Sequence, residues 1–303
     1  MDAVNREAKS LVLTPLDEGF EKHLIEYGCF PHNFAHRDGQ GMPANWEELQ
    51  QVIRPQGHDS KTTLASDDVA RIHRHDRGDF SGELLRVLEE GDEDFARSVR
   101  FDRLKPLTDG SLIAAEPTLY NGAKIGQLSK QACEALEPYI VPSRAKENPI
   151  LPNFFMEPWP SCSHYRVGMR QSLYIGCMGA RAMQVLQSYG KPDPIFDGNA
   201  YTIVVTYYDE VLKLYSLHPM KSVESGPPVQ YHMTRLASFA IGNVETLRAA
   251  LTAYRNLRDW TKGKRDEFIK AANGRVIILA FSPVKSLEYL VIRSAWLIYA
   301  IGH

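Results

Sequence analysis

The sequence is poor in cysteine and lacks a segment that marks secretion. Its 303 residues include four cysteines, which lie far apart and form no CxxC pair. A disulfide scaffold or a zinc ribbon needs closely spaced pairs, so neither is expected. The chain also begins without the cationic and then apolar stretch of a secretory signal. We therefore expect an intracellular, reduced protein of the cytoplasm or the nucleus.

An excess of basic charge is missing as well. Thirty-five Lys and Arg residues stand against 37 Asp and Glu residues, which gives a formal net charge of -2. A domain that binds a nucleic-acid backbone normally carries a clear excess of cations, so strong nucleic-acid binding is not expected. The composition, 44% hydrophobic and 24% charged, is typical of a globular protein and excludes a polytopic membrane protein and a disordered chain.

The common motifs of cofactor binding and catalysis are also absent. No stretch matches a P-loop, a GxGxxG turn after a strand, HExxH or GxSxG. In those motifs the glycines approach a phosphate, the histidines hold zinc or the serine acts as a nucleophile. The sequence therefore predicts no cofactor and no metal ion.

What is present falls into three regions. Residues 1–100 are polar and predict a helical N-terminal region packed on the core. Residues 101–274 predict an α/β core. Residues 275–303 form an apolar C-terminal tail, but charged residues interrupt it before it reaches the length of about 18 apolar residues that a membrane helix requires. We expect this tail to pack as a strand and helix or to be an appended tail, and membrane contact is the less favoured alternative.

Hydrophobic periodicity predicts the elements of these regions. In the N-terminal region, helices are expected at 17–28, 45–53, 67–75 and 81–100. In the core, strands are expected at 107–116, 149–159 and, as a hairpin, 200–219, and helices at 125–141, 169–190 and 243–274, while 230–242 is a short helix or strand. The predicted fold class is α/β (α+β), with a mixed central sheet flanked by helices behind the helical N-terminal region.

Several segments between 101 and 274 carry a resemblance to a known family. They are RLKPLTDGSLIAAEPTLYNGA, LPNFFMEPWP, RQSLYIGCMGARAMQVLQSYG, DGNAYTIVVTYYDEVLKLYSLHP and LTAYRNLRDWTKGKRDEFIKAANG. This part of the chain resembles a group of uncharacterised fungal proteins with a restriction-endonuclease-like domain of the PD-(D/E)XK type. The resemblance implies a restriction-endonuclease-like central sheet.

The resemblance also implies a site, and this chain departs from it. Such nucleases use an Asp and a Glu on neighbouring strands to hold a divalent cation, a Lys two residues after the Glu, and a Gln on the following helix. Here Thr118 stands at the Asp position and Trp159 at the Lys position, whereas Glu157 and Gln171 are retained. Cleavage of phosphodiesters by this mechanism should therefore be lost. Glu116 is a poor substitute for the Asp because Pro117 stiffens the intervening step.

Further substitutions turn the site into an aromatic and apolar hollow, which small organic ligands commonly occupy. The residues expected to contact an apolar small molecule are Thr118, Tyr120, Phe155, Trp159, Met169 and Ile175. The residues expected to be catalytic are Glu157, His164, Tyr165 and Gln171.

The function favoured by these residues is metal-free acid–base chemistry of a cyclase, isomerase or lyase type, for example in fungal secondary metabolism. Glu157 would act as the general acid or base with a pKa raised by Trp159 and Phe155. His164 or Tyr165 would donate a proton, and Gln171 would polarise a carbonyl. The alternatives are a catalytically dead pseudo-nuclease that serves as a scaffold or interaction module, and a residual DNA nuclease. In the scaffold alternative, Glu157 is an inert residue paired with Arg170. A homo-oligomer is left open.

Overall fold

A mixed seven-stranded sheet forms the centre of the computed structural model, which describes residues 12–34, 41–54, 80–89, 94–159, 165–222 and 226–281. The strand order in the described part is β1-β7-β6-β5-β4-β3-β2. The strands are β1 (Cys29–Phe30), β2 (Phe95–Arg97), β3 (Leu119–Ala123), β4 (Ile150–Pro158), β5 (Thr202–Tyr208), β6 (Val211–Lys221) and β7 (Val229–Ala240). Strand β4 is parallel to β5, and β1 is parallel to β7, while the other neighbours are antiparallel.

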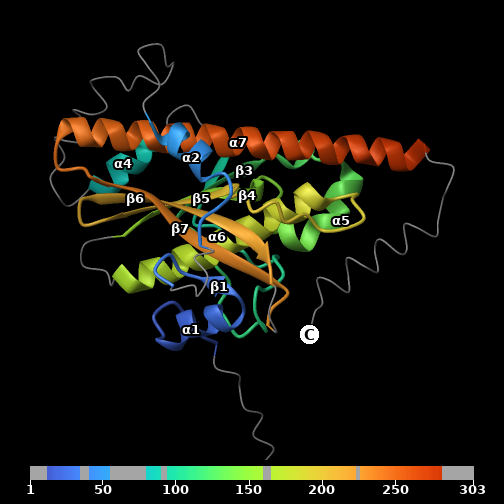
Figure 1. Cartoon of the computed structure of the whole chain (residues 1–303), viewed down its shortest axis with the longest axis horizontal. Coiled ribbons are helices and arrows are strands. Elements are labelled where there is room, and N and C mark those ends of the chain that lie inside the picture. The colour runs from blue at the N-terminus through green and yellow to red at the C-terminus, as the bar shows by residue number, and fades with distance from the viewer. Residues whose placement is uncertain are drawn as a thin grey trace, which may run out of the picture.

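Helices cover both faces of this sheet, as Figure 1 shows. They are α1 (Gly19–Glu26), α2 (Trp46–Ile53), α4 (Phe80–Glu89), α5 (Lys130–Ile140), α6 (Tyr165–Ser188) and α7 (Val244–Phe281), with a 3-10 turn η1 (Ile125–Gln127). The long helix α7 lies on one face together with α2 and α4, and α6 lies on the other face together with α1. The predicted mixed α/β class with flanking helices is confirmed.

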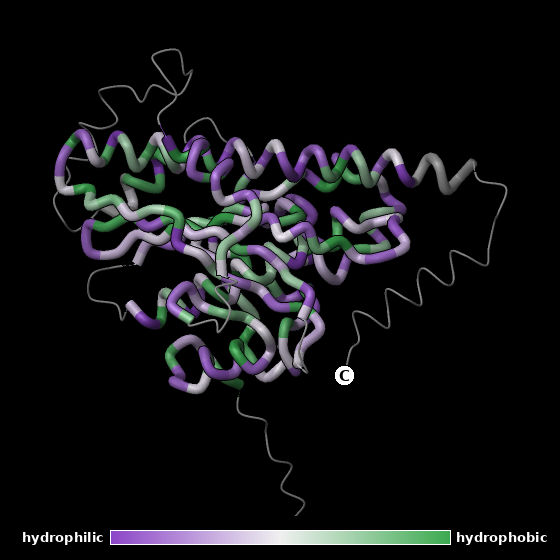
Figure 2. Tube along the Cα trace, viewed as in Figure 1, coloured by the Kyte–Doolittle hydropathy of each residue, from purple (hydrophilic) through white to green (hydrophobic). Residues whose placement is uncertain are grey.

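The alternation of side chains along the strands divides the core between these two faces. On β4, Phe154 and Met156 pack with α7, whereas Phe155 packs with α6. Figure 2 shows apolar and polar segments alternating along α7, which is the pattern of a helix with one buried face. Because α6 is buried over most of its length, it forms the inner layer on its side of the sheet.

Two glycines of α6 allow this helix to lie close to the sheet. A Cβ atom at Gly176 would come within 2.6 Å of Leu217, and one at Gly179 would come within 2.8 Å of Phe155 and 2.9 Å of the Pro152 carbonyl oxygen. Real Cβ atoms do not approach so closely. The small residues of this helix therefore permit its close packing on the sheet.

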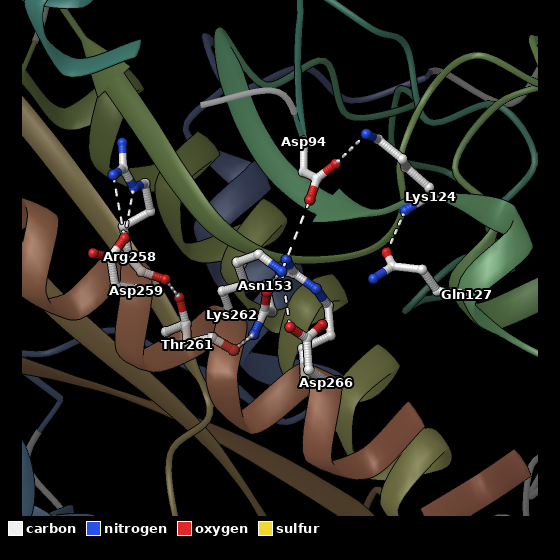
Figure 3. A network of polar contacts seen from close by, with 10 residues as sticks. Asp94, Lys124, Gln127, Asn153, Arg258, Asp259, Thr261, Lys262 and Asp266 are labelled. Carbon is white, nitrogen blue, oxygen red and sulfur yellow. Dashed lines mark hydrogen bonds and ion pairs between the residues drawn. The ribbon is translucent and has the colours of Figure 1, made fainter. Parts of the chain in front are cut away.

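A polar network fixes α7 to β4 on the opposite face (Figure 3). The guanidinium of Arg265, only 1% exposed, donates to Asn153 Oδ1, and the Asn153 amide donates to the Tyr201 and Thr261 carbonyl oxygens at 3.0 and 3.1 Å. Lys262 pairs with Asp266 at 2.8 Å and lies 3.9 Å from Asp94. The basic stretch 262–270 therefore includes a buried arginine as well as paired surface charges.

Two expected elements differ in the structure. The predicted strand at 107–116 is not formed. Leu112 makes only an isolated bridge with Leu13, and β3 begins after Pro117 rather than ending there. The reason is that Pro117 has no N–H to donate to a strand partner, so regular pairing starts beyond it. The expected helical stretch 81–100 ends at Glu89 in the described chain, and 95–97 forms the edge strand β2.

The N-terminal region contributes both edges of the sheet as well as helices. Strand β1 pairs with β7, and strand β2 pairs with β3. The segment 230–242, predicted as a short helix or strand, lies in strand β7. The expected helix at 67–75 and the tail beyond residue 281 lie outside the described residues. No helix in the described part is long and apolar enough to cross a membrane.

Candidate functional site

Glu157 lies near the end of the central strand β4, on the face of the sheet that α6 covers. Its strand partner is Thr206 on β5. The side chain follows Phe155 by two positions and therefore points to the same face. It is 0% exposed, so its carboxyl group is fully separated from bulk water.

Neutral groups from two other segments hold this carboxyl. The backbone N–H of Thr118 donates to Oε1 at 2.7 Å, and the Thr118 hydroxyl lies 3.1 Å from Oε2. The amide of Gln171 lies 3.4 Å from Oε2 and also donates to the Glu116 carbonyl oxygen at 2.9 Å. The structure thus brings Thr118, Glu157 and Gln171 together, from the entry to β3, the end of β4 and the second turn of α6.

Burial dominates the acidity of Glu157. Loss of hydration raises the pKa of its carboxyl to about 8, and the hydrogen bonds from Thr118 and Gln171 only partly oppose this shift. Near neutral pH the group therefore retains its proton to a large extent. In that state its O–H can donate to the Thr118 hydroxyl oxygen, while the other carboxyl oxygen still accepts the Thr118 N–H.

The site lacks the charges that a metal-dependent nuclease needs. Among the described residues, no three His, Cys, Asp or Glu side chains gather as a potential metal site. Glu116 is exposed, and it is its carbonyl oxygen that Gln171 contacts. Arg170 does not form the ion pair with Glu157 that the sequence left open, because its guanidinium donates to the Pro15 and Asp17 carbonyl oxygens and lies 3.7 Å from the Glu21 carboxylate.

Trp159 follows Glu157 at the position where the resemblance implies a lysine. Its backbone N–H donates to the Tyr207 carbonyl oxygen at 2.7 Å. The indole lies against Gly168 of α6, where a Cβ atom would come within 2.7 Å of the indole nitrogen. The indole N–H is buried without a hydrogen-bond partner, although the residue as a whole is partly exposed. Trp159 therefore presents a neutral donor in place of a cation.

The other residues predicted to contact a ligand differ in how deeply they are buried. Tyr120, Phe155 and Ile175 are 0% exposed and pack in the apolar core between α6 and the sheet. The Tyr120 hydroxyl is occupied, because it donates to the Pro149 carbonyl oxygen at 2.9 Å. Met169 is partly buried against the same core. A ligand could therefore reach Met169 and Trp159 more readily than the three core residues.

Neither of the two remaining predicted catalytic residues is among the hydrogen-bond partners of Glu157 in the described part of the chain. His164 lies outside the described residues. Tyr165 begins α6 and packs over the next strands, with its ring 5.5 Å from that of Tyr208. The ammonium of Lys213 on β6 lies 3.3 Å from the Tyr165 hydroxyl and 4.6 Å from the centre of its ring.

Lys213 was missed by the sequence reasoning, although a signal for it existed. The hairpin was expected to turn near Asp209 and Glu210, and both residues have positive φ angles, 49° and 60°, in a two-residue turn. That turn sets Thr206 opposite Lys213. Thr206 is also the strand partner of Glu157 on β4. Glu157, Thr206 and Lys213 are therefore neighbours in one row that runs across β4, β5 and β6.

Comparison with known proteins identifies no relative of this chain. No protein-family model, no curated protein and no solved structure matches the chain. The resemblance to nuclease-like fungal proteins therefore stays a prediction.

Proposed function

We propose that this chain is a non-nucleolytic protein of a nuclease-like type that binds and transforms a small organic molecule by metal-free acid–base chemistry at Glu157. The observation that supports the proposal is a fully buried carboxyl with a pKa of about 8, held only by neutral groups. A group that exchanges its proton near neutral pH is suited to general acid–base catalysis.

The neighbours of Glu157 fit such chemistry better than phosphoryl chemistry. Thr118, Gln171 and Trp159 offer neutral hydroxyl, amide and indole groups, which can polarise a carbonyl oxygen or orient a ligand. They do not supply the second carboxylate and the cation that hydrolysis of a phosphodiester would need. In the proposed reaction Glu157 gives its proton to one atom of the ligand and takes a proton back from another, as an isomerase, cyclase or lyase requires.

The arrangement is compatible with the resemblance. Thr118 directly precedes β3, which pairs antiparallel with β4, the strand of Glu157, through Leu119 and Met156. Gln171 lies on α6, the helix that follows β4. These are the relative positions that the resemblance implies for the Asp, the Glu and the Gln of an active nuclease. We therefore propose that the site descends from a metal and phosphate site.

The experiment is proton exchange in D₂O with EDTA present. The purified chain is incubated with carbonyl compounds that have acidic α-hydrogens, and mass spectrometry follows deuterium uptake and rearrangement. The wild type should convert at least one compound, and Glu157→Gln, which keeps a hydrogen-bonding group but cannot transfer the proton, should not. Glu116→Gln, a change of an exposed carboxylate nearby, is the matched control. Equal conversion by Glu157→Gln would contradict the assigned role.

A nuclease assay separates the residual-nuclease alternative. With Mg²⁺ or Mn²⁺ present, plasmid DNA should remain intact. Cleavage that disappears in Glu157→Ala would overturn the proposal in favour of a nuclease.

A scaffold role is the second candidate, and one observation favours it. Both oxygens of Glu157 are engaged within the protein, and the residue has no exposed surface. In that case the carboxyl is a structural link between β3, β4 and α6. If no compound is converted while Glu157→Ala strongly lowers the free energy of unfolding, the structural link is the better description.

A further inference from the structure

A second group of charged and aromatic side chains lies on the same face of the sheet as Glu157. Lys213 on β6, Arg235 on β7 and His32, just after β1, form what we name the cation cluster. Strand pairing places Tyr215 opposite Arg235, and the ring of His32 lies 5.2 Å from that of Tyr215. Three segments far apart in the sequence therefore bring nitrogen-bearing side chains to one place.

The members of the cation cluster influence one another. Burial lowers the pKa of His32, and the positive charges of Arg235 and Lys213 lower it further. The hydroxyl of Tyr165 lies beside Lys213, and burial raises the pKa of Tyr215 although the positive charge of Arg235 opposes this shift. Within the described ranges, no carboxylate lies within ion-pair distance of Lys213 or Arg235. Positive charges gathered without a counter-charge are unfavourable until an anion binds between them.

The beginning of α6 adds to the positive potential at this place. The helix has 24 residues and starts at Tyr165, whose ring lies over Lys213. The N-terminal end of a long helix carries free peptide N–H groups and the positive end of the helix dipole. Its first turn contains no acidic residue that would neutralise this end.

The cation cluster stands in a fixed relation to the carboxyl of the proposed active site. Glu157, Thr206 and Lys213 are partners in one row across β4, β5 and β6. Because neighbouring strands are about 4.8 Å apart, the backbones of Glu157 and Lys213 are separated by roughly 10 Å. That distance matches a ligand of one or two rings with a charged group at one end and a reactive carbon at the other.

We infer that the cation cluster binds the anionic group of the small molecule, a carboxylate or a phosphate carried by an aromatic or apolar body. Tyr165, whose ring packs against that of Tyr208 and lies beside the Lys213 ammonium, would contact the body of the ligand together with Tyr208. The inference deepens the proposed function and rests on it for the part played by Glu157, but binding of the anion itself depends on Lys213, Arg235 and His32.

The test is calorimetric titration of the full chain with three probes of the same ring system. 2-Naphthoate and 2-naphthyl phosphate should bind, and their relative affinities tell a carboxylate site from a phosphate site, whereas the uncharged 2-naphthamide should bind at least tenfold more weakly. Equal binding of 2-naphthoate and 2-naphthamide would overturn the inference, because recognition would then not depend on the negative charge.

Variants separate the cation cluster from the rest of the surface. Lys213→Gln and Arg235→Gln should each weaken 2-naphthoate binding at least tenfold, and Lys213→Arg should retain it. Lys221→Gln is the matched control, since Lys221 is an exposed lysine on the same strand and lies roughly 26 Å further along it. Arg235 is exposed, so its variant remains informative if Lys213→Gln does not fold. Unchanged binding in Arg235→Gln and in a folded Lys213→Gln would overturn the inference.

The same titration distinguishes this inference from the proposed reaction. Glu157→Gln should still bind 2-naphthoate at least tenfold more tightly than 2-naphthamide, because the preference for the negative charge depends on Lys213 and Arg235 and not on Glu157. If binding depends on Lys213 but the wild type converts no compound, the anion site is supported and only the proposed acid–base function is overturned. If the wild type converts a compound but binds no anionic probe, the acid–base function is supported and the anion site is overturned.

Discussion

The backbone N–H of Thr118 donates to the carboxyl of Glu157 at 2.7 Å, and the hydroxyl of the same threonine lies 3.1 Å from the other carboxyl oxygen. One residue thus contacts both oxygens of a buried acid. A neutral side chain at position 118 suits this pairing, because a carboxylate there would oppose the ionisation of Glu157 and, once both groups were ionised, would face it without water to separate the two charges.

The first prediction concerns pH. The folded chain holds the proton of Glu157 more tightly than the unfolded chain does, since folding raises the pKa from 4.5 to about 8. The contribution of this group to stability is therefore complete below pH 4.5 and is lost as the pH rises towards 8, at about 1.4 kcal/mol per pH unit at most. Glu157→Gln cannot ionise, so its stability relative to the wild type should increase over this range.

Urea unfolding at pH 5, 6, 7 and 8 measures this difference. Glu116→Gln, which changes an exposed carboxylate nearby, is the control for removal of one acidic group. A constant difference between Glu157→Gln and the wild type from pH 5 to pH 8 would contradict the raised pKa.

The second prediction restores a carboxylate. At pH 9, above the pKa of Glu157, Thr118→Asp should lower the free energy of unfolding by about 1–3 kcal/mol in EDTA, because both carboxyl groups are then ionised and repel each other and the hydroxyl contact is lost. Millimolar Mn²⁺ should recover part of this loss, since two carboxylates can share a divalent cation that one cannot hold well. Thermal unfolding with and without Mn²⁺ measures the effect. Thr118→Asn, similar in size but neutral, should not respond to the metal, and an equal response of both variants would count against the argument.

The third prediction uses two glycines in different helices. Gly179→Ala should lower the free energy of unfolding by about 1–3 kcal/mol, because the new methyl group would meet the Pro152 carbonyl oxygen and Phe155 in the core. Gly263→Ala in α7 meets no atom within 4 Å and should raise stability by about 0.5–1 kcal/mol through better helix propensity. Urea denaturation of both variants decides the matter, and a stabilised Gly179→Ala would show that α6 does not lie as close to the sheet as described.

The fourth prediction concerns the buried arginine of α7. Arg265→Met should cost about 1–3 kcal/mol, because the Asn153 side-chain oxygen loses the guanidinium donor inside the protein. Lys270→Met, an exposed change on the same helix, should stay within about 0.5 kcal/mol of the wild type. In a double-mutant cycle with Asn153→Leu, the two losses should not add, since both changes remove the same contact. Additive losses would show that the pair is not coupled.

Much of the fold could be predicted because several segments carry strong periodic or compositional signals. The run of β-branched and aromatic residues in 202–207 and the short apolar run of 154–156 indicated β5 and β4, and long apolar periodicity indicated α6 and α7. The edge strands β1 and β2 have two and three residues, which is too short for a period of two to be recognised. Their pairing depends on partners elsewhere in the chain.

The candidate site was predicted in part for a similar reason. The gathering of Thr118, Glu157 and Gln171 was implied by the resemblance, although Thr118 lies before a strand and not at the end of one. The buried role of Arg265 could not be predicted, because a basic stretch in a helix usually faces solvent. Its environment is set by Asn153, more than a hundred residues earlier in the chain.

The two edges of the sheet have a consequence for the way the protein is made. Strand β1 lies next to β7 through Cys29 and Tyr231, so β1 leaves the ribosome roughly 200 residues before its neighbour in the sheet. At the usual rate of synthesis of about 5–20 residues per second, it waits for roughly 10–40 s before that neighbour exists. During this interval the growing chain exposes the free edge of each newest strand, and the sheet is complete only when synthesis has passed residue 240. Assembly of the whole sheet is therefore a late event, and a nascent chain arrested before β7 is the state in which a chaperone would find an open edge to bind.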